Sequence, residues 1–167
     1  MKQSKKVALG GIFAALAVVI MSMGGLIPVA TFVCPMFCMI LLRLVSQLCG
    51  RRIGWTWYGA VAILSLLLGP DKEAAAVFVF LGYYPVVKPS LDKAKVSVLC
   101  KLALFNTAIG IMYFLLIRLF GMDQIAAEYA ELGTALTVVM LVLGNVTFFL
   151  LDIVLGRLDL TKKRRRR

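Results

Sequence analysis

The sequence lacks histidine altogether, and only eight of its 167 residues are aspartate or glutamate. Histidine is the commonest general base and the commonest metal ligand, so its absence argues against most acid–base and metal-dependent enzymes. The chain also contains no GxxxxGK(S/T) phosphate loop and no GxSxG nucleophile elbow. We therefore expect a protein that is not an enzyme and that uses no cofactor and no metal ion.

Cysteine is scarce, and its four residues all lie in or beside apolar runs. They are Cys34, Cys38, Cys49 and Cys100. A CxxxC spacing without histidine is a poor zinc signal, and the pattern does not resemble a disulfide framework. We expect buried thiols that pack as small hydrophobic groups.

Long apolar runs dominate the rest of the chain, which is 62% hydrophobic with a mean hydropathy of +0.95. Soluble domains are closer to about 45–50% apolar. The net charge is +11, yet most lysines and arginines fall between the apolar runs, as in the cytoplasmic loops of membrane proteins. The sequence therefore predicts one all-α domain over residues 1–167, a polytopic membrane helix bundle, and no nucleic-acid partner.

Six apolar runs are long enough to be considered as membrane helices. They are Val7–Ile27, Val29–Leu48, Ile53–Leu68, Ala74–Val87, Val96–Phe120 and Thr134–Leu155. A crossing helix needs about 20 apolar residues, so the fourth run is short and could be re-entrant. The loop Gly121–Gly133 could hold a short interfacial helix.

The distribution of basic residues predicts the orientation of these helices. If all six runs cross, one side of the membrane receives most of the basic residues and the other receives most of the acidic ones. The basic side carries Lys2, Lys5, Lys6, Arg51, Arg52, Lys88, Lys93, Lys95 and the tail 161–167, and the acidic side carries Asp71, Glu73, Asp123, Glu128 and Glu131. Because lysine and arginine favour the cytoplasmic side, we expect six transmembrane helices in the plasma membrane with both termini cytoplasmic.

The first run carries a face of small residues. Ala8, Gly11 and Ala15 recur at spacings of three and four, and Gly10 and Ala14 widen the same face. Such a face allows another backbone to approach closely within lipid. It could dock a partner helix or pack against helices of the same chain. A signal peptide is disfavoured, because the run exceeds the 7–15-residue apolar core of such peptides.

A few polar residues fall inside the runs, where they are costly and often functional. Arg43 could extend to the membrane interface or pair with Asp152, which is predicted at a similar depth. Asn145 lies near the middle of its run and could bond another helix or a ligand.

On the outer side, several polar residues could converge on a small polar ligand, although they could equally be solvated loop ends. The predicted ligand-binding residues are Asp71, Glu73, Tyr113, Arg118, Thr137 and Asn145. The stretch YYPVVKPSLDK is distinctive, but its sequence assigns it no role.

With KKVALGGIFAALAVVIM as its first helix, six short spans and no ATPase motif, the chain resembles the substrate-binding S component of energy-coupling factor transporters. In that family an AxxxA-type face of the first helix docks on a shared membrane coupling subunit. Here Ala8, Gly11, Ala14 and Ala15 occupy the comparable face, with GxxxA in place of AxxxA.

The resemblance implies a plasma-membrane subunit that binds a small micronutrient, such as a vitamin, from outside. Its partners would be a transmembrane coupling subunit and two cytosolic ATPases, whose ATP hydrolysis would drive release of the ligand inside. Two alternatives stay open. One is a small membrane scaffold or assembly protein without a ligand. The other is an autonomous small transporter or channel, which would need a charge relay within the membrane.

Overall fold

The computed structural model describes residues 3–23, 30–118 and 123–158, with backbone alone for 30, 123–132 and 134–135. Within these ranges the chain forms helices and no strand, so the predicted all-α class is confirmed. The helices are α1 (Gln3–Ser22), α2 (Ala30–Cys49), α3 (Arg51–Leu68), α4 (Lys72–Leu81), α5 (Tyr84–Leu91), α6 (Ser97–Arg118) and α7 (Asp123–Arg157).

Four of the six predicted runs correspond to a single helix whose ends agree within a few residues where they are described, and the sixth run lies within the longer helix α7. The fourth run is different, because it forms two helices, α4 and α5, separated at Gly82 and Tyr83. The Gly82 N–H still reaches the Phe78 carbonyl, but Pro85 has no N–H with which to continue the ladder. The predicted end at Val87 is also wrong, since α5 continues to Leu91.

A bend divides α7 into two parts. Gly133 has φ 71° and ψ 165°, a conformation that only glycine adopts without strain, and it separates a short first part from the long second part. The predicted short helix within Gly121–Gly133 is therefore confirmed at the level of the backbone from Asp123 onward. The second part of α7 covers the sixth apolar run.

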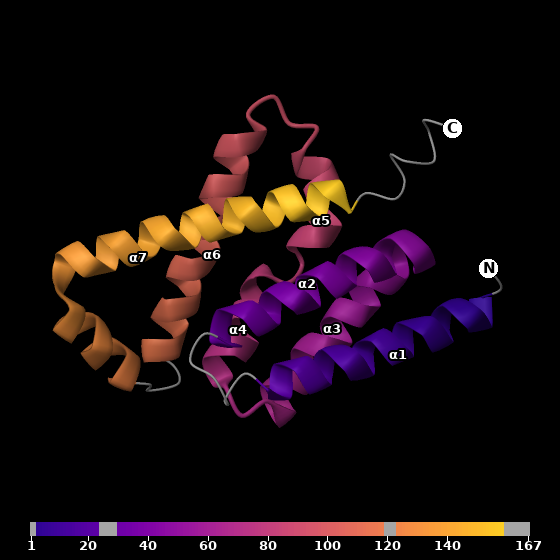
Figure 1. Cartoon of the computed structure of the whole chain (residues 1–167), viewed down its shortest axis with the longest axis horizontal. Helices are drawn as coiled ribbons and strands as arrows, with labels where there is room; N and C mark the ends of the chain where they lie inside the picture. The colour runs from indigo at the N-terminus through magenta and orange to yellow at the C-terminus, as the bar shows by residue number, and fades with distance from the viewer. Residues whose placement is uncertain (1–2, 24–29, 119–122, 159–167) are drawn as a thin grey trace.

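Helices α1, α2 and α3 pack on one another, and α4 packs on α2, α3 and α6 (Figure 1). Helix α5 lies against α2, while α7 packs mainly on α6, which it crosses at a steep angle. The start of α1, the corner between α2 and α3, and the end of α7 point to the same side of the molecule. The chain thus forms a helix bundle with α1 at one edge and α7 at the other.

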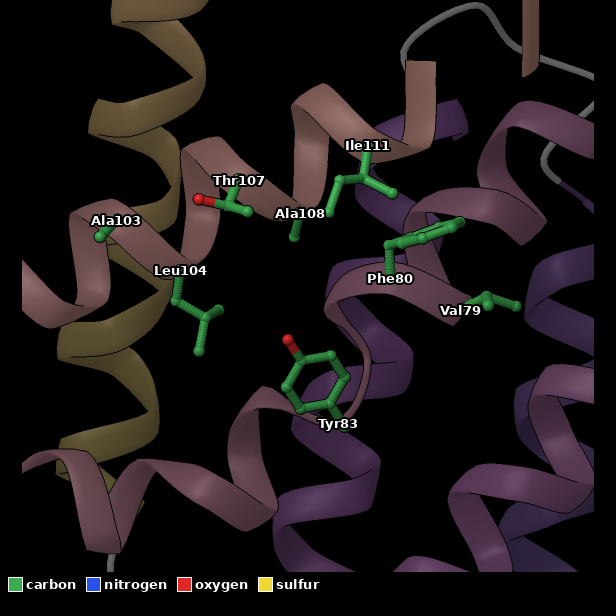
Figure 2. A pocket seen from close by; sticks show the side chains of 8 residues that line it. All are labelled: Val79, Phe80, Tyr83, Ala103, Leu104, Thr107, Ala108 and Ile111. Atoms are coloured by element: carbon green, nitrogen blue, oxygen red, sulfur yellow. The ribbon is translucent and has the colours of Figure 1, made fainter. Parts of the chain in front are cut away.

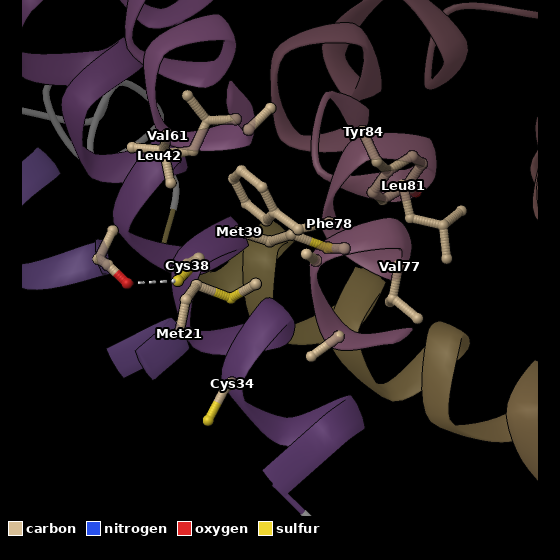
Figure 3. Packing of buried hydrophobic residues seen from close by; sticks show 14 of the residues in the cluster. Met21, Cys34, Cys38, Met39, Leu42, Val61, Val77, Phe78, Leu81 and Tyr84 are labelled. Carbon is tan, nitrogen blue, oxygen red and sulfur yellow. Dashed lines mark hydrogen bonds between the residues drawn. The ribbon is translucent and has the colours of Figure 1, made fainter. Parts of the chain in front are cut away.

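Buried apolar residues from all seven helices form one core cluster, and part of it lies between α1, α2, α3 and α4. Figure 3 shows Met21, Cys38, Met39 and Phe78 packed there, all at most 2% exposed. The Cys38 thiol donates to the Ala17 carbonyl oxygen at 3.5 Å. All four cysteines are free. Cys34, Cys38 and Cys49 are buried as predicted, but the prediction is wrong for Cys100, which is exposed on α6.

Five segments are long and apolar enough to cross a membrane. They are Gln3–Ser22, Thr31–Cys49, Lys72–Leu91, Ser97–Arg118 and Leu136–Arg157. Helix α3 is not among them, because it has 18 residues and begins with two arginines. Large apolar side chains are exposed along the second part of α7, as expected for surface that faces lipid. These features are those of a membrane protein, while six crossings and cytoplasmic termini stay predictions.

Candidate functional site

Three of the polar residues predicted for the outer side form contacts around the start of α4. The Asp71 carboxylate caps this helix by accepting from the Ala74 N–H at 3.0 Å, and it also accepts from the Thr31 hydroxyl at 2.7 Å. A carboxylate at a helix N-terminus is stabilised by the orphan N–H groups and the helix dipole. Asp71 therefore joins α2 to α4 and has a structural function whether or not a ligand binds.

Glu73 forms a second link at the same end of α4. It accepts a hydrogen bond of 2.7 Å from the Tyr113 hydroxyl on α6. Arg118, the last residue of α6, is exposed. Three of the predicted ligand-binding residues, Asp71, Glu73 and Tyr113, thus form contacts around the start of α4.

The two predicted ligand residues on α7 form other contacts. The Thr137 hydroxyl donates to the Gly133 carbonyl at 2.9 Å, within its own helix. Asn145 exchanges amide hydrogen bonds of 2.9 and 3.2 Å with Asn106 on α6. The sequence left two roles open for Asn145, a hydrogen bond to another helix or a contact with a ligand. The structure contains the first of them.

Replacing Asn106 with leucine should weaken the contact between α6 and α7 only modestly. Hydrogen bonds between membrane helices contribute about 0.6 kcal/mol on average, and about 1.7 kcal/mol at most. We expect the double variant Asn106→Leu/Asn145→Leu to be no less stable than either single variant, because each single variant leaves one amide without its partner. Titration of the three variants with SDS in mixed micelles would measure this, and a strictly additive loss would contradict a reciprocal pair.

A cluster of buried charges lies where α5, α6 and α7 meet. Asp152 on α7 accepts from Lys88 and from the Tyr84 hydroxyl, both on α5, and from Lys101 on α6 at 2.9 Å. Asp92 completes the cluster, 3.5 Å from the Lys88 ammonium and 2.5 Å from that of Lys101. We call these five residues the ionic cluster; two ammonium groups face two carboxylates in it.

The sequence builds the ionic cluster from regular helix spacing. Tyr84, Lys88 and Asp92 recur every fourth residue, so they share one face of α5 and its C-cap. The Lys88 and Lys101 side chains are only 5% and 8% exposed. Lysine side chains that are buried to this extent need carboxylate partners, because burying an uncompensated charge away from water is costly. Tyr84 and Phe148 pack beside the charges with ring centroids 4.7 Å apart.

Arg43 is buried in α2, with 5% of its surface exposed, and it does not extend to an interface. Its guanidinium donates to the Pro85 carbonyl at 3.0 Å, at the start of α5. A pairing with Asp152 is one of the two roles that the sequence leaves open for Arg43, and Asp152 contacts Lys88, Lys101 and Tyr84 in the structure. This hydrogen bond joins α2 to the start of α5, just after the break between α4 and α5.

Some small residues of α1 pack against the bundle, and others are exposed. Gly10, Ala17 and Met21 are buried, and a Cβ at Gly10 would lie 3.7 Å from Ile53. Ala14 is half-buried against the core. The other predicted docking residues, Ala8, Gly11 and Ala15, are exposed, and a Cβ on Gly11 would meet no atom of the described residues within 4 Å.

Sequence reasoning missed the ionic cluster, although it noticed YYPVVKPSLDK. The available signal was the four-residue spacing of Tyr84, Lys88 and Asp92, together with single charges at Lys101 and Asp152 inside apolar runs. Among the residues with described side chains, no group of three or more histidine, cysteine, aspartate or glutamate side chains could hold a metal ion.

No protein family, no curated protein and no solved structure matches the chain. Its function therefore has to be argued from its own residues.

Proposed function

We propose that this chain is the membrane-embedded substrate-binding subunit of an energy-coupling-factor-type micronutrient transporter. Its ligand is a small polar molecule taken from outside, and its partners are a transmembrane coupling subunit and two cytosolic ATPases. The observation that carries the proposal is the uncovered stripe of Ala8, Gly11 and Ala15 along α1. The described helices of the chain leave this stripe open, although they cover the opposite side of α1.

The proposal gives the two faces of α1 different tasks. The buried face, with Gly10 and Ala17, holds α1 on α2 and α3. The small stripe then offers a close approach to one helix of the coupling subunit, where packing rather than hydrophobicity drives association within lipid. Because the sequence has no phosphate-binding loop, the energy for release has to come from the partner ATPases.

The polar start of α4 is the proposed ligand-binding end. Asp71, Glu73 and Tyr113 supply hydrogen-bonding groups there, and Arg118 at the end of α6 adds a cation. A small polar ligand would exchange its hydrogen bonds with water for bonds to these groups. Both termini are placed in the cytoplasm in this proposal, where the basic tail 161–167 contacts anionic lipid.

Enlarging the small stripe should abolish partner binding while leaving the chain folded. In the variant Gly11→Leu/Ala15→Leu, the added side chains point away from the bundle and separate the two backbones. We expect the tagged wild-type chain, purified from its native membrane in mild detergent, to retain one membrane subunit and two proteins with nucleotide-binding motifs. The variant should lose all three, as identified by mass spectrometry.

Leu16→Phe is the matched control, because it adds volume at an exposed position next to the stripe. It should retain the partners. Recovery of the wild-type chain without any ATPase, under conditions that preserve a known transporter of this type, would refute the proposal.

A second candidate is a self-contained transporter, which the ionic cluster and the broken segment α4–α5 favour. Charges at membrane depth and interrupted helices are typical of secondary transporters. This candidate predicts ligand uptake into vesicles that contain the purified chain alone. The energy-coupled subunit predicts no accumulation in such vesicles until the partner proteins and ATP are supplied.

A further inference from the structure

A groove of about 450 Å³ lies between the broken segment and α6 (Figure 2). Its first wall consists of Val79, Phe80 and Tyr83, at and just before the break between α4 and α5. Its second wall is a stripe of α6 in which the small side chains of Ala103 and Ala108 leave the space open. The volume lies within the range of about 300–1,000 Å³ that is common for small-molecule sites.

The position of the groove beside a helix break is the first argument for a binding site. The segment Lys72–Leu91 is long and apolar enough to cross a membrane, yet its helix stops at Gly82 and Tyr83. Gly82 and Tyr83 keep right-handed helical backbone angles, so the interruption lies in the hydrogen-bond ladder rather than in an unwound loop. Such an interruption at membrane depth is tolerated where the backbone is buried in protein or lines a cavity. Transporters often bind their substrates at such interruptions.

The hydroxyl of Tyr83 is the second argument. Figure 2 shows this hydroxyl directed into the groove, toward α6. The other tyrosines whose side chains are described all donate to a protein acceptor: Tyr58 to Val79, Tyr84 to Asp152 and Tyr113 to Glu73. Across residues 3–23, 30–118 and 123–158, no hydrogen bond is made by the Tyr83 hydroxyl. A donor in such apolar surroundings is best satisfied by an acceptor that the occupant supplies.

The lining of the groove defines the class of occupant. Two hydroxyls, those of Tyr83 and Thr107, are its only side-chain polar groups among the described lining residues, and none of these residues is charged. Ala103, Thr107 and Ile111 are exposed on the outer side of α6, so the groove opens on surface that faces lipid. An occupant that enters from the bilayer must be uncharged and lipid-soluble.

We propose that the groove binds a neutral, lipid-soluble molecule whose carbonyl oxygen accepts a hydrogen bond from Tyr83. This site lies at the opposite end of α4 from Asp71 and Glu73, so it is distinct from the polar ligand-binding end. It goes beyond the proposed uptake function and stands whether or not that proposal is correct.

Benzophenone is a suitable probe, because it is a neutral, lipid-soluble aromatic ketone that reacts where it binds. On irradiation its carbonyl oxygen takes a hydrogen atom from a nearby C–H group, and the two resulting radicals join, so the whole molecule is added to the protein. The full-length chain in phosphatidylcholine nanodiscs would be irradiated over a range of benzophenone concentrations. Labelled peptides would then be quantified by mass spectrometry.

Labelling of the peptides that contain Val79–Tyr83 and Ala103–Ile111 should saturate in the wild-type chain. Tyr83→Phe removes one hydrogen bond and should raise the half-saturating concentration about 2- to 10-fold. Ala103→Phe fills the groove from its exposed edge and should abolish the saturable labelling. Ala60→Phe, an exposed alanine on α3, is the matched control and should label as the wild type does.

Labelling that rises in proportion to concentration, with no response to Tyr83→Phe or Ala103→Phe, would mean that benzophenone reacts only from the bulk lipid. That result would overturn the proposal. Saturable labelling that Ala103→Phe removes but Tyr83→Phe leaves unchanged would overturn the hydrogen bond to Tyr83.

Discussion

Asp152→Ala should be the most destabilising replacement of a polar side chain in this protein. It leaves the ammonium groups of Lys88 and Lys101 in place, 5% and 8% exposed, without the carboxylate that lies between them. Removing one partner of a buried ion pair typically costs about 3–5 kcal/mol, because the remaining charge stays buried. The free energy of unfolding, measured by SDS titration in mixed micelles, should fall by about this amount.

Asp92→Ala is the control for the Asp152 prediction. Asp92 contacts the same two lysines but is 43% exposed, so the expected loss is below about 1 kcal/mol. Replacing the buried charges together, as Lys88→Met/Lys101→Met/Asp152→Leu, should restore much of the stability, because no uncompensated charge remains. If Asp92→Ala and Asp152→Ala lowered the free energy of unfolding equally, burial of the carboxylate would not be what decides the loss of stability.

The ionic cluster helps to hold α7 on the rest of the bundle. The first part of the last apolar run, Leu136–Leu143, exposes nearly all of its apolar side chains. Contacts of α7 with the bundle are concentrated farther along, where Phe148 stacks on Phe105 at 4.8 Å and Asp152 binds the two lysines. Helix α7 is therefore anchored near its end, and the anchor is electrostatic as well as apolar.

The extent of most helices could be predicted from the sequence, because each of these helices corresponds to one continuous run of apolar residues. The hydropathy of Val96–Phe120, for example, predicted the start of α6 within one residue, while the predicted end at Phe120 lies outside the described residues. The break at Gly82 was harder to predict. Its surroundings are as apolar as those of a continuous helix, and only Pro85, three residues later, signals it.

The ionic cluster could not be predicted because its members are distant along the chain. Lys88, Lys101 and Asp152 come from three helices, and their meeting depends on how α7 crosses α6. The candidate ligand residues were grouped by membrane side alone. That criterion correctly associated Glu73 with Tyr113, but it carries no information on which helices are neighbours. Thr137 was therefore grouped with them, although its hydroxyl bonds within α7.

The second large effect is expected at Gly54, where α3 lies directly against Ser46 of α2. A Cβ at this position would lie 3.2 Å from the Ser46 Cβ and closer still to its Oγ. A Cβ built on Gly59, on the same helix, would meet no atom within 4 Å among the residues that the structure describes. Replacing glycine with alanine within a helix stabilises the folded chain by about 0.8–1.0 kcal/mol through helix propensity, whereas overpacking destabilises it by about 1–3 kcal/mol. We expect Gly59→Ala to stabilise the chain and Gly54→Ala to be less stable than Gly59→Ala by about 1–3 kcal/mol.

A second substitution at Ser46 tests whether the clash is the cause. The Ser46 hydroxyl is buried and makes no hydrogen bond within the part of the chain that the structure describes, so Ser46→Ala alone should cost nothing. In the double variant Gly54→Ala/Ser46→Ala, the closest colliding atom is gone and stability should rise above that of Gly54→Ala. The recovery should be incomplete, because the Ser46 Cβ remains 3.2 Å from the new methyl group. SDS titration of the four chains gives the coupling free energy between the two positions, and a coupling of zero would mean that the Ser46 hydroxyl is not what opposes a side chain at position 54.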